Sequence, residues 1–459
     1  MNRTRIVSTI GPATADYDSL VALHAEGMNV VRLNMSHGDE RFYQMVVKNL
    51  RKLNKGLLNP VGLLWDLQGP EIRTGDLLEP ISVKKGDRLV LSSRPKTELG
   101  RVIVPVSYDQ FAEEVSRGDI LLIDNGSIKL SVLQVMGTEV RCEVHNKGII
   151  TSRRHLNLSG KKTRLPSMGT KDLKDLDLAV KLGADWIALS YVRDAKDMVK
   201  LKAALKKKKS DAFVMAKIET AQAVDHFESL LEQSDGIMVA RGDLGAEMPF
   251  EQVPRLQAEI VEWCRRVGKP VVIATHMLES MMKSPQPTRA EANDVAFAVS
   301  QETDATMLSG ETAVGEYASL SVQAMRKIVL AAEDSWLLSI KVPRDVEGDF
   351  EELLLSAASL SDQVDAEAVI VFTRSGYTAL RLSHHRPKAS LIAVSHSMKT
   401  CQKLSLVWGV QAFHNSMRGD FSKRLQKSIS YLLKQGVLSK GQKIVAVDHD
   451  GLSVQLVVV

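Results

Sequence analysis

Acidic and basic side chains follow two apolar segments near the middle of the chain. The apolar run 213–216 is followed by Lys217 and Glu219, and the run 236–240 is followed by Asp243. Side chains along a strand alternate between its two faces, so Lys217 and Glu219 would share one face. An ammonium group and two carboxylates at neighbouring strand ends form either a structural ion pair or a charged site for chemistry.

The chemistry that suits such a site is the transfer of a phosphoryl group. Glu219 and Asp243 carry carboxylate oxygens, which are the ligands that Mg²⁺ or Mn²⁺ prefers. Lys217 and Arg32 would meet the negative charge on a phosphoryl group or on a developing enolate. The hydroxyl of Thr275, which ends another apolar run, would relay a proton through a water molecule.

A second set of polar groups lies earlier in the chain. Arg32, Asn34 and Ser36 alternate with apolar residues, and Asp66 ends the apolar run 61–66. Asn34, Ser36 and Asp66 together offer oxygens with a single formal negative charge. That combination is better matched to a monovalent cation such as K⁺ than to a divalent one.

The order of predicted elements indicates a scaffold that brings these residues together. Outside residues 74–165, about eight strand-like runs alternate with helix-like segments, which is the number that closes a (β/α)₈ barrel. The polar residues fall at or just past the ends of these strands, where such barrels carry their active sites. Residues 74–165 instead hold short strands separated by glycine-containing turns. They predict an all-β insert that leaves at the same rim and acts as a lid.

We therefore predict a TIM barrel in two pieces, residues 1–69 and 167–341, with an inserted β-barrel lid domain at 70–166. Residues 342–459 are predicted to form a C-terminal α/β regulatory domain after a linker. At the first loop of this domain, hydroxyls, an arginine and a glycine precede a predicted helix, which suits a bound phosphate or an ordinary N-capping turn. These residues are Thr373, Arg374, Ser375, Gly376 and Thr378.

Composition sets limits on the function. The chain has 459 residues with a net charge of +5, which indicates several domains and favours neither nucleic acid nor membrane as a partner. Its three cysteines, Cys142, Cys264 and Cys401, are far apart and form no C-x-x-C pair. We see no signal peptide or long apolar run, and so expect a cytoplasmic protein. The chain also lacks a Walker loop.

Seven segments together resemble the signatures of the pyruvate kinase family, in order and in spacing, over nearly the whole chain. They begin at residues 9, 29, 69, 215, 235, 274 and 307 and read TIGPAT, NVVRLNMSHG, GPEIRTG, MAKIET, DGIMVARGDLGAEMP, ATHMLESMMKSPQPTRAEANDVA and MLSGETAVGEY. The resemblance implies the three-domain arrangement above. It also implies transfer of phosphate from phosphoenolpyruvate to ADP, giving pyruvate and ATP.

The resemblance assigns roles to individual residues. Lys217 stabilises the transition state, with Arg32 and Thr275 as further catalytic residues. The residues that contact or border phosphoenolpyruvate are Arg32, Gly242, Asp243 and Thr275. The residues on the nucleotide side are Arg73, Arg154, His37 and Asn34. The Mg²⁺ or Mn²⁺ ligands are Glu219 and Asp243, and the K⁺ ligands are Asn34, Ser36, Asp66 and the carbonyl of Leu67. The loop 373–378 would bind a sugar-phosphate effector, and a homotetramer is expected.

Some positions depart from the pattern of the family. Leu67 and Gln68 replace a Thr-Lys pair that many members have, and Arg154 stands where a lysine is usual. Glu71 is the residue found in members that require K⁺, so we expect K⁺ dependence. Asp448 and Asp450 stand where a glycine-rich effector loop is common. Their charge would repel a bisphosphate, so we expect no activation by fructose bisphosphate, and a monophosphate effector stays open.

Two other functions fit parts of the sequence. Metal-dependent aldolases and lyases also use barrels to handle pyruvate-like substrates, but they lack the β insert and the oxygen cluster of Asn34, Ser36 and Asp66. A metabolite-binding protein without catalysis is the other alternative. The presence of Lys217 and Glu219 argues against it.

Overall fold

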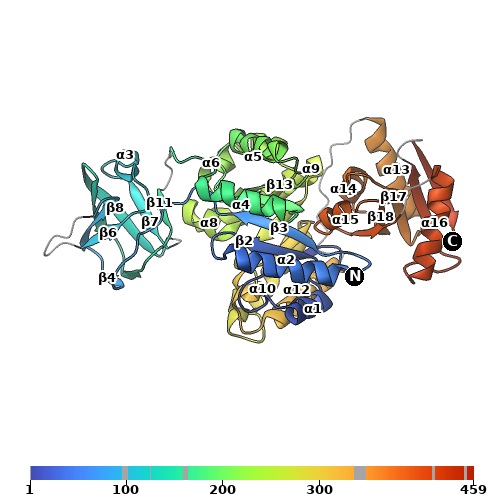
Figure 1. Cartoon of the computed structure of the whole chain (residues 1–459), viewed down its shortest axis with the longest axis horizontal. Helices are drawn as coiled ribbons and strands as arrows, with labels where there is room; N and C mark the ends of the chain where they lie inside the picture. The colour runs from blue at the N-terminus through green and yellow to red at the C-terminus, as the bar shows by residue number, and fades with distance from the viewer. Residues whose placement is uncertain are drawn as a thin grey trace.

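The computed structural model describes residues 2–95, 102–124, 126–158, 164–334, 348–415, 419–448 and 452–459. Three bodies lie in a row in Figure 1, with the strands of the insert at one end, the barrel in the middle and the C-terminal α/β domain at the other end. The insert and the C-terminal domain therefore flank opposite sides of the barrel. The expected domain boundary at 341/342 lies outside the described residues.

Eight parallel strands close into a barrel, as the alternation of strands and helices predicted. They are β1 (Arg5–Thr9), β2 (Val30–Asn34), β3 (Gly62–Leu67), β12 (Trp186–Leu189), β13 (Phe213–Ile218), β14 (Gly236–Ala240), β15 (Val271–Ala274) and β16 (Ala305–Leu308). Around the barrel their order is β1-β16-β15-β14-β13-β12-β3-β2. The strands are buried along nearly their whole length, which explains why they read as continuous apolar runs.

The longer helices cover the outside of the barrel because they bury apolar residues against the strands. Asp16 and Asp39 cap the first two helices by accepting hydrogen bonds from Ser19 N and Phe42 N. The helices are α1 (Tyr17–Glu26), α2 (Glu40–Asn54), α4 (Thr170–Lys181), α5 (Ala195–Lys207), α6 (Ala221–Asp225), α7 (Phe227–Gln233), α8 (Arg241–Glu247), α9 (Val253–Val267), α10 (Arg289–Ser300), α11 (Gly310–Ala313) and α12 (Ala318–Glu333). Short 3₁₀ turns lie at Phe250–Gln252 and Glu279–Met282.

The insert is built almost entirely from strands around a core of its own. A six-stranded sheet has the order β11-β7-β8-β9-β5-β6, and β10 pairs with β4. The strands are β4 (Ile81–Val83), β5 (Arg88–Ser92), β6 (Ile103–Pro105), β7 (Ile120–Ile123), β8 (Ile128–Met136), β9 (Glu139–Val144), β10 (Gly148–Ile150) and β11 (Leu156–Leu158), with one short helix, α3 (Phe111–Glu114).

The C-terminal domain is a five-stranded sheet of order β19-β18-β17-β20-β21. Its strands are β17 (Ala368–Phe372), β18 (Ser390–Ser395), β19 (Val410–His414), β20 (Lys443–Asp448) and β21 (Ser453–Val458). Its helices are α13 (Asp349–Gln363), α14 (Tyr377–His384), α15 (Met398–Leu404) and α16 (Phe421–Lys434). Strands β17 to β20 pair in parallel, as is typical of the α/β domain that the sequence predicted, and the edge strand β21 pairs antiparallel with β20.

The C-terminal domain packs against the amino ends of the barrel strands. Arg5, the first residue of β1, donates from Nε to Val407 O at 3.0 Å. Trp186, the first residue of β12, donates from Nε1 to Lys403 O at 2.9 Å. The carboxyl ends of the strands are thereby left to face the insert, as Figure 1 also shows.

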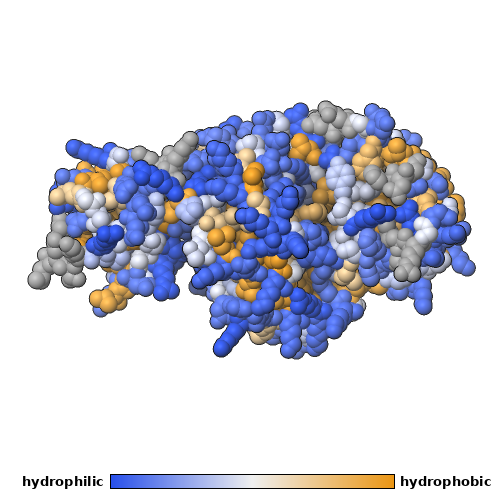
Figure 2. Space-filling model, turned by 45° about the horizontal axis from the view of Figure 1, so that its top comes forward, coloured by the Kyte–Doolittle hydropathy of each residue, from blue (hydrophilic) through white to orange (hydrophobic). Residues whose placement is uncertain are grey.

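The surface is polar over most of the face drawn in Figure 2, with apolar residues gathered in small separate areas. Within the described part of the chain, none of the helices has the length and apolar character needed to cross a membrane.

Candidate active site

Lys217 is the centre of a compact group of charges at the carboxyl ends of the barrel strands. Its Nζ lies 2.9 Å from Glu219 Oε1 and 3.2 Å from Asp66 Oδ1, and it donates to Ser190 Oγ at 2.7 Å. These partners come from three strands, because β12 lies between β13 and β3 in the barrel. The alternation argument for Lys217 and Glu219 is therefore consistent with the observed contact.

Asp66 joins this group to Arg32. Arg32 donates to Asp66 Oδ2 from Nε at 2.8 Å and from Nη2 at 2.5 Å, and its Nη1 donates to Thr9 Oγ1 at 2.8 Å. The sequence had suggested one cluster around Lys217 and a separate one around Asp66. The structure merges them, because β13 and β3 lie on either side of β12 and their inward side chains meet.

The charges of this group are not balanced. Burial acts to lower the pKa of Lys217, but the carboxylates of Asp66 and Glu219 outweigh it and raise that pKa above its ordinary value. Burial acts to raise the pKa of Asp66, but the positive charges of Lys217 and Arg32 outweigh it, and the pKa is lowered. Burial raises the pKa of Glu219 despite Lys217, and the charge of Asp243 adds to the rise. One lysine shared among several carboxylates leaves Glu219 short of positive charge.

Asp243 lies in the first turn of α8, directly after β14, and Tyr191 connects it to Glu219. The Tyr191 hydroxyl donates to Asp243 Oδ1 at 3.1 Å, and the Tyr191 amide donates to Glu219 Oε2 at 2.7 Å. Burial, and then the charges of Asp243 and Glu219, raise the pKa of Tyr191, so its hydroxyl stays protonated. The sequence prediction missed both Ser190 and Tyr191. Their position directly after the end of β12 was the signal that marks them.

These groups line a cavity of about 280 Å³ between the barrel mouth and the lid. The barrel contributes the catalytic side chains and two of the four acidic residues, and the lid contributes the other two together with three arginines. The lining residues are Arg32, Asn34, Ser36, His37, Gln68, Glu71, Arg73, Asp124, Arg153, Arg154, His155, Ser190, Tyr191, Lys217, Glu219 and Asp243. A cavity lined by a lysine, an arginine and two carboxylates can hold a phosphorylated anion with a cation beside it.

Two family models match the chain. One, described as the barrel domain of pyruvate kinase, matches residues 1–322, and the other, described as its alpha/beta domain, matches residues 351–455. The chain belongs to the pyruvate kinase family. It is a phosphotransferase of the pyruvate kinase kind.

Named pyruvate kinases match the chain over nearly its full length. Plastidial pyruvate kinase 3 of Arabidopsis thaliana is 38% identical over 448 residues, which cover 97% of this chain and 78% of the relative. A pyruvate kinase of Staphylococcus epidermidis is 36% identical over 451 residues, covering 97% and 77%. The crystal structure of a pyruvate kinase from Cryptosporidium parvum matches with a TM-score of 0.91 at 34% identity, covering 100% of this chain and 96% of that chain.

The residues that the pyruvate kinase resemblance places on the nucleotide side all line this cavity. Arg73 pairs from Nε with Glu71 Oε2 at 2.6 Å. Arg154 lies 3.5 Å from Asp124. His37 and Asn34 line the same cavity. Burial, followed by the charge of Arg73, lowers the pKa of His37, so His37 is neutral at pH 7.

Thr275 reaches the site through Gly242. Its Oγ1 accepts from Gly242 N at 2.7 Å and donates to Ala274 O at 2.6 Å. Gly242 directly precedes Asp243 in α8. Thr275 has φ +69°, a backbone conformation that non-glycine residues rarely adopt and that often occurs at functional sites. The two residues thus fix the turn that presents Asp243.

The oxygens expected to hold K⁺ come from adjacent strand ends. Asn34 in β2 is the register partner of Asp66 in β3. Asn34 Oδ1 accepts from Ser36 N at 3.0 Å, and the carbonyl of Leu67 accepts from Ser190 Oγ at 2.7 Å. Side-chain and backbone oxygens are thus brought together, although Asp66 is also bound by Arg32.

The predicted effector loop lies on the C-terminal domain, between β17 and α14. Thr373 Oγ1 accepts from Gly376 N at 2.9 Å, and Gly376 has φ +99°. Arg374 and Ser375 are exposed. Asp448 lies 3.9 Å from Arg424, which offsets part of its charge. Asp450 lies outside the described residues, so the expected repulsion of a bisphosphate stays a prediction.

Proposed function

We propose that the chain transfers the phosphoryl group of phosphoenolpyruvate to ADP, giving pyruvate and ATP. The single observation that carries this proposal is the position of Lys217. Its ammonium lies between Asp66 and Glu219 and lines the same cavity as Arg32 and Asp243. Membership of the pyruvate kinase family supports the choice of substrates.

The barrel side and the lid side of the cavity would bind different substrates. Arg32 is held at a fixed orientation by Asp66 and Thr9, so it can receive the phosphate of phosphoenolpyruvate. Arg73 and Arg154 on the lid side would receive the phosphates of ADP. The two phosphorylated substrates would then face each other across Lys217.

The reaction breaks the bond between phosphorus and the enol oxygen of phosphoenolpyruvate. A β-phosphate oxygen of ADP forms the new bond to phosphorus. Lys217 contributes positive charge where the phosphoryl oxygens and the enolate oxygen carry negative charge. The enolate then takes a proton at its terminal carbon and becomes pyruvate. Thr275, which is hydrogen-bonded to Gly242 beside Asp243, would pass that proton on through water.

Glu219 and Asp243 fit a divalent cation. Both line the cavity, Tyr191 holds both, and Glu219 is short of compensating positive charge. No cluster of three or more His, Cys, Asp or Glu side chains suited to a metal occurs in the described ranges, so substrate oxygens would complete the shell. When bound, Mg²⁺ or Mn²⁺ supplies charge neutralisation at the transferring phosphate.

We further propose that Asn34, Ser36, Asp66 and the carbonyl of Leu67 hold K⁺. Their oxygens come from neighbouring ends of β2 and β3. Glu71 is the residue that the resemblance associates with a K⁺ requirement, and its carboxylate, paired with Arg73, brings no positive charge to the site. K⁺ therefore remains the source of the additional positive charge.

Three remaining proposals concern regulation and context. The loop of Thr373 to Thr378 would bind the phosphate of a sugar monophosphate effector.

The three cysteines are free and buried, which suits the reducing cytoplasm. The homotetramer that the resemblance implies can be checked by light scattering on the purified protein.

A coupled assay tests the proposed function. ATP formation from phosphoenolpyruvate and ADP should require Mg²⁺ or Mn²⁺ and should be much faster with K⁺ than with tetramethylammonium. Release of pyruvate without ATP would instead indicate a lyase or a phosphatase. Equal rates with the two monovalent cations would contradict the K⁺ site while leaving the transfer reaction in place.

A further inference from the structure

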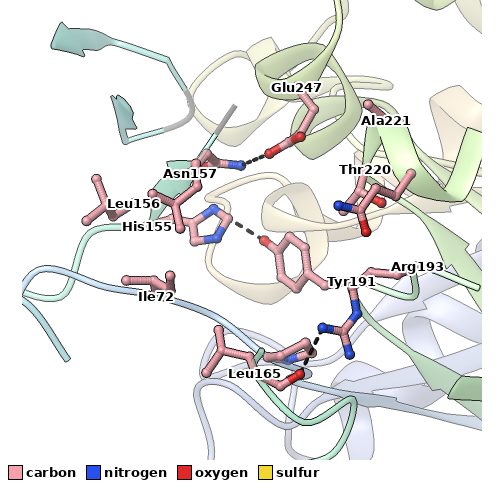
Figure 3. Close-up of a pocket in the computed structure, with 13 residues that line it drawn as sticks. Ile72, His155, Leu156, Asn157, Leu165, Tyr191, Arg193, Thr220, Ala221 and Glu247 are labelled. Atoms are coloured by element: carbon pink, nitrogen blue, oxygen red, sulfur yellow. Dashed lines mark hydrogen bonds between the residues drawn. The ribbon is translucent and has the colours of Figure 1, made fainter. Parts of the chain in front are cut away.

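Two side chains of one short lid segment contact the barrel. His155 directly precedes β11 and Asn157 lies within it, and both reach toward the barrel in Figure 3. His155 Nδ1 lies 3.4 Å from the Tyr191 hydroxyl, and the ring centroids are 5.0 Å apart. Asn157 Nδ2 donates to Glu247 Oε1 at 3.1 Å.

Both contacts lead to α8, the short helix that carries Asp243. Glu247 is the last residue of α8, and Asp243 lies in its first turn and accepts from the Tyr191 hydroxyl at 3.1 Å. A small cavity of about 80 Å³ lies among these residues. The lid segment therefore contacts the last residue of α8 directly, and it reaches the first turn of α8 only through Tyr191.

Tyr191 is built to hold two carboxylates at once. Its backbone has φ +52°, in the left-handed region that a tyrosine rarely adopts. This conformation directs its amide to Glu219 Oε2 at 2.7 Å while its hydroxyl reaches Asp243. The hydroxyl has one hydrogen. When it donates to Asp243, its lone pairs remain to accept from an Nδ1–H of His155.

We propose that Tyr191 is a positioning residue for Glu219 and Asp243, and that His155 couples its hydroxyl to the position of the lid. Removing a residue that hydrogen-bonds to a metal ligand and orients it commonly weakens metal binding. The inference rests on the proposed function in one respect, namely that Glu219 and Asp243 are the metal ligands. It adds that the lid influences the metal site through a side-chain contact as well as through closure over the substrates.

The variant Tyr191→Phe removes the hydroxyl and keeps the ring. Mn²⁺ binding to the full chain, measured from the free Mn²⁺ signal in electron paramagnetic resonance without substrates, should weaken about tenfold. The matched control is Tyr108→Phe, because the Tyr108 hydroxyl also donates to a carboxylate, Glu114 at 2.9 Å, but within the lid. The control should bind Mn²⁺ like the wild type. An unchanged Mn²⁺ affinity in Tyr191→Phe overturns the positioning role.

A double-mutant cycle tests the lid contact. His155→Ala should weaken Mn²⁺ binding in the wild-type background but have no further effect in Tyr191→Phe. His155→Asn keeps an N–H near the position of Nδ1 and should restore much of the affinity. Equal effects of His155→Ala in both backgrounds would show that His155 acts without Tyr191, which overturns the coupling.

Kinetics separates this inference from the proposed function. In Tyr191→Phe we expect a higher Mg²⁺ concentration for half-maximal rate, with kcat largely recovered at saturating Mg²⁺. Loss of kcat that Mg²⁺ does not recover would contradict a role through the metal ligands. If the wild type makes no ATP, the proposed function fails, and the Mn²⁺ measurements still decide whether Tyr191 positions the acidic pair. Thermal melting of each variant shows whether it is folded. If Tyr191→Phe does not fold, His155→Ala tests the same contact from the lid side.

Discussion

The two ends of the barrel both bury charged side chains, yet they use them differently. At the amino end, Arg5 is fully buried and donates from Nε to Val407 O. Asp304 lies at the same end and pairs with Arg386 at 3.0 Å. At the carboxyl end, Lys217 and Asp66 are also buried. The number of buried charged side chains therefore does not distinguish the amino end of the barrel from the carboxyl end.

What distinguishes them is where the charges point. The amino-end groups meet backbone carbonyls and opposite charges of the C-terminal domain, which is fixed against them. The carboxyl-end groups converge on a cavity of about 280 Å³ and leave Glu219 incompletely compensated. A buried charge whose partners are all fixed contributes to folding. Buried charges that share an open space and a charge imbalance can bind a ligand.

Replacement of Lys217 should produce the largest effect. Lys217→Met removes the ammonium that faces the transferring group, so kcat/KM should fall by a factor on the order of 10³. The matched control is Lys202→Met, a half-exposed lysine 3.4 Å from Asp235, which should keep nearly full activity. Comparable losses in the two variants would remove the distinction between the two ends. Circular dichroism should confirm that Lys217→Met is folded, because it leaves Asp66 and Glu219 without their shared cation.

Asp185 at the amino end should affect stability and not turnover. It accepts from Leu63 N at 2.8 Å and lies 3.3 Å from Lys399 Nζ, and burial raises its pKa from 3.8 to about 6. The folded protein then holds this proton more tightly than the unfolded chain, so stability falls as pH rises through this range. The decline, relative to Asp185→Asn, should reach about 3 kcal/mol.

The measurement for Asp185 is denaturant unfolding of both proteins between pH 4 and about pH 6.5, where the folded group titrates. The activity of Asp185→Asn at pH 7 should equal that of the wild type. Parallel stability curves for the two proteins would show that Asp185 does not have the raised pKa. A large loss of activity would show that the amino end takes part in catalysis.

The smallest effect is expected in the loop after strand β17 of the C-terminal domain. Arg374 is a single exposed cation there, in contrast to the several charged groups that surround Lys217. Arg374→Ala should weaken binding of glucose 6-phosphate about tenfold, the cost of one charge-assisted contact. Turnover without effector should stay unchanged. Lys427→Ala, an exposed cation on α16, is the control. Calorimetry that shows equal binding in Arg374→Ala and the wild type would contradict the effector loop.

The sequence predicted the features that depend on local periodicity. The alternation along β13 anticipated that Lys217 and Glu219 share a face, and the eight apolar runs anticipated the closed barrel. The bond between Lys217 and Asp66 depends on strand order around the barrel, which local patterns do not contain. The edge strand β21 was missed because its alternating, half-exposed residues follow a turn near the end of the chain.

The contacts of Tyr191 could not be predicted from the sequence for a related reason. Local patterns do not predict its left-handed backbone, and its contact with His155 depends on where the lid lies against the barrel. Residues 36 positions apart in the chain are brought together there by the packing of the inserted domain against the barrel. Only the rule that active sites gather at carboxyl ends of barrel strands pointed to this position.

Anomalous diffraction from crystals grown with Mn²⁺ and oxalate, a planar mimic of enolpyruvate, tests the central claim most directly. A Mn²⁺ peak within bonding distance of Glu219 and Asp243, with oxalate between the ion and Lys217, is the predicted result. A peak at other residues, or oxalate bound away from Lys217, would contradict the assignment of this cavity as the place where the phosphoryl group moves.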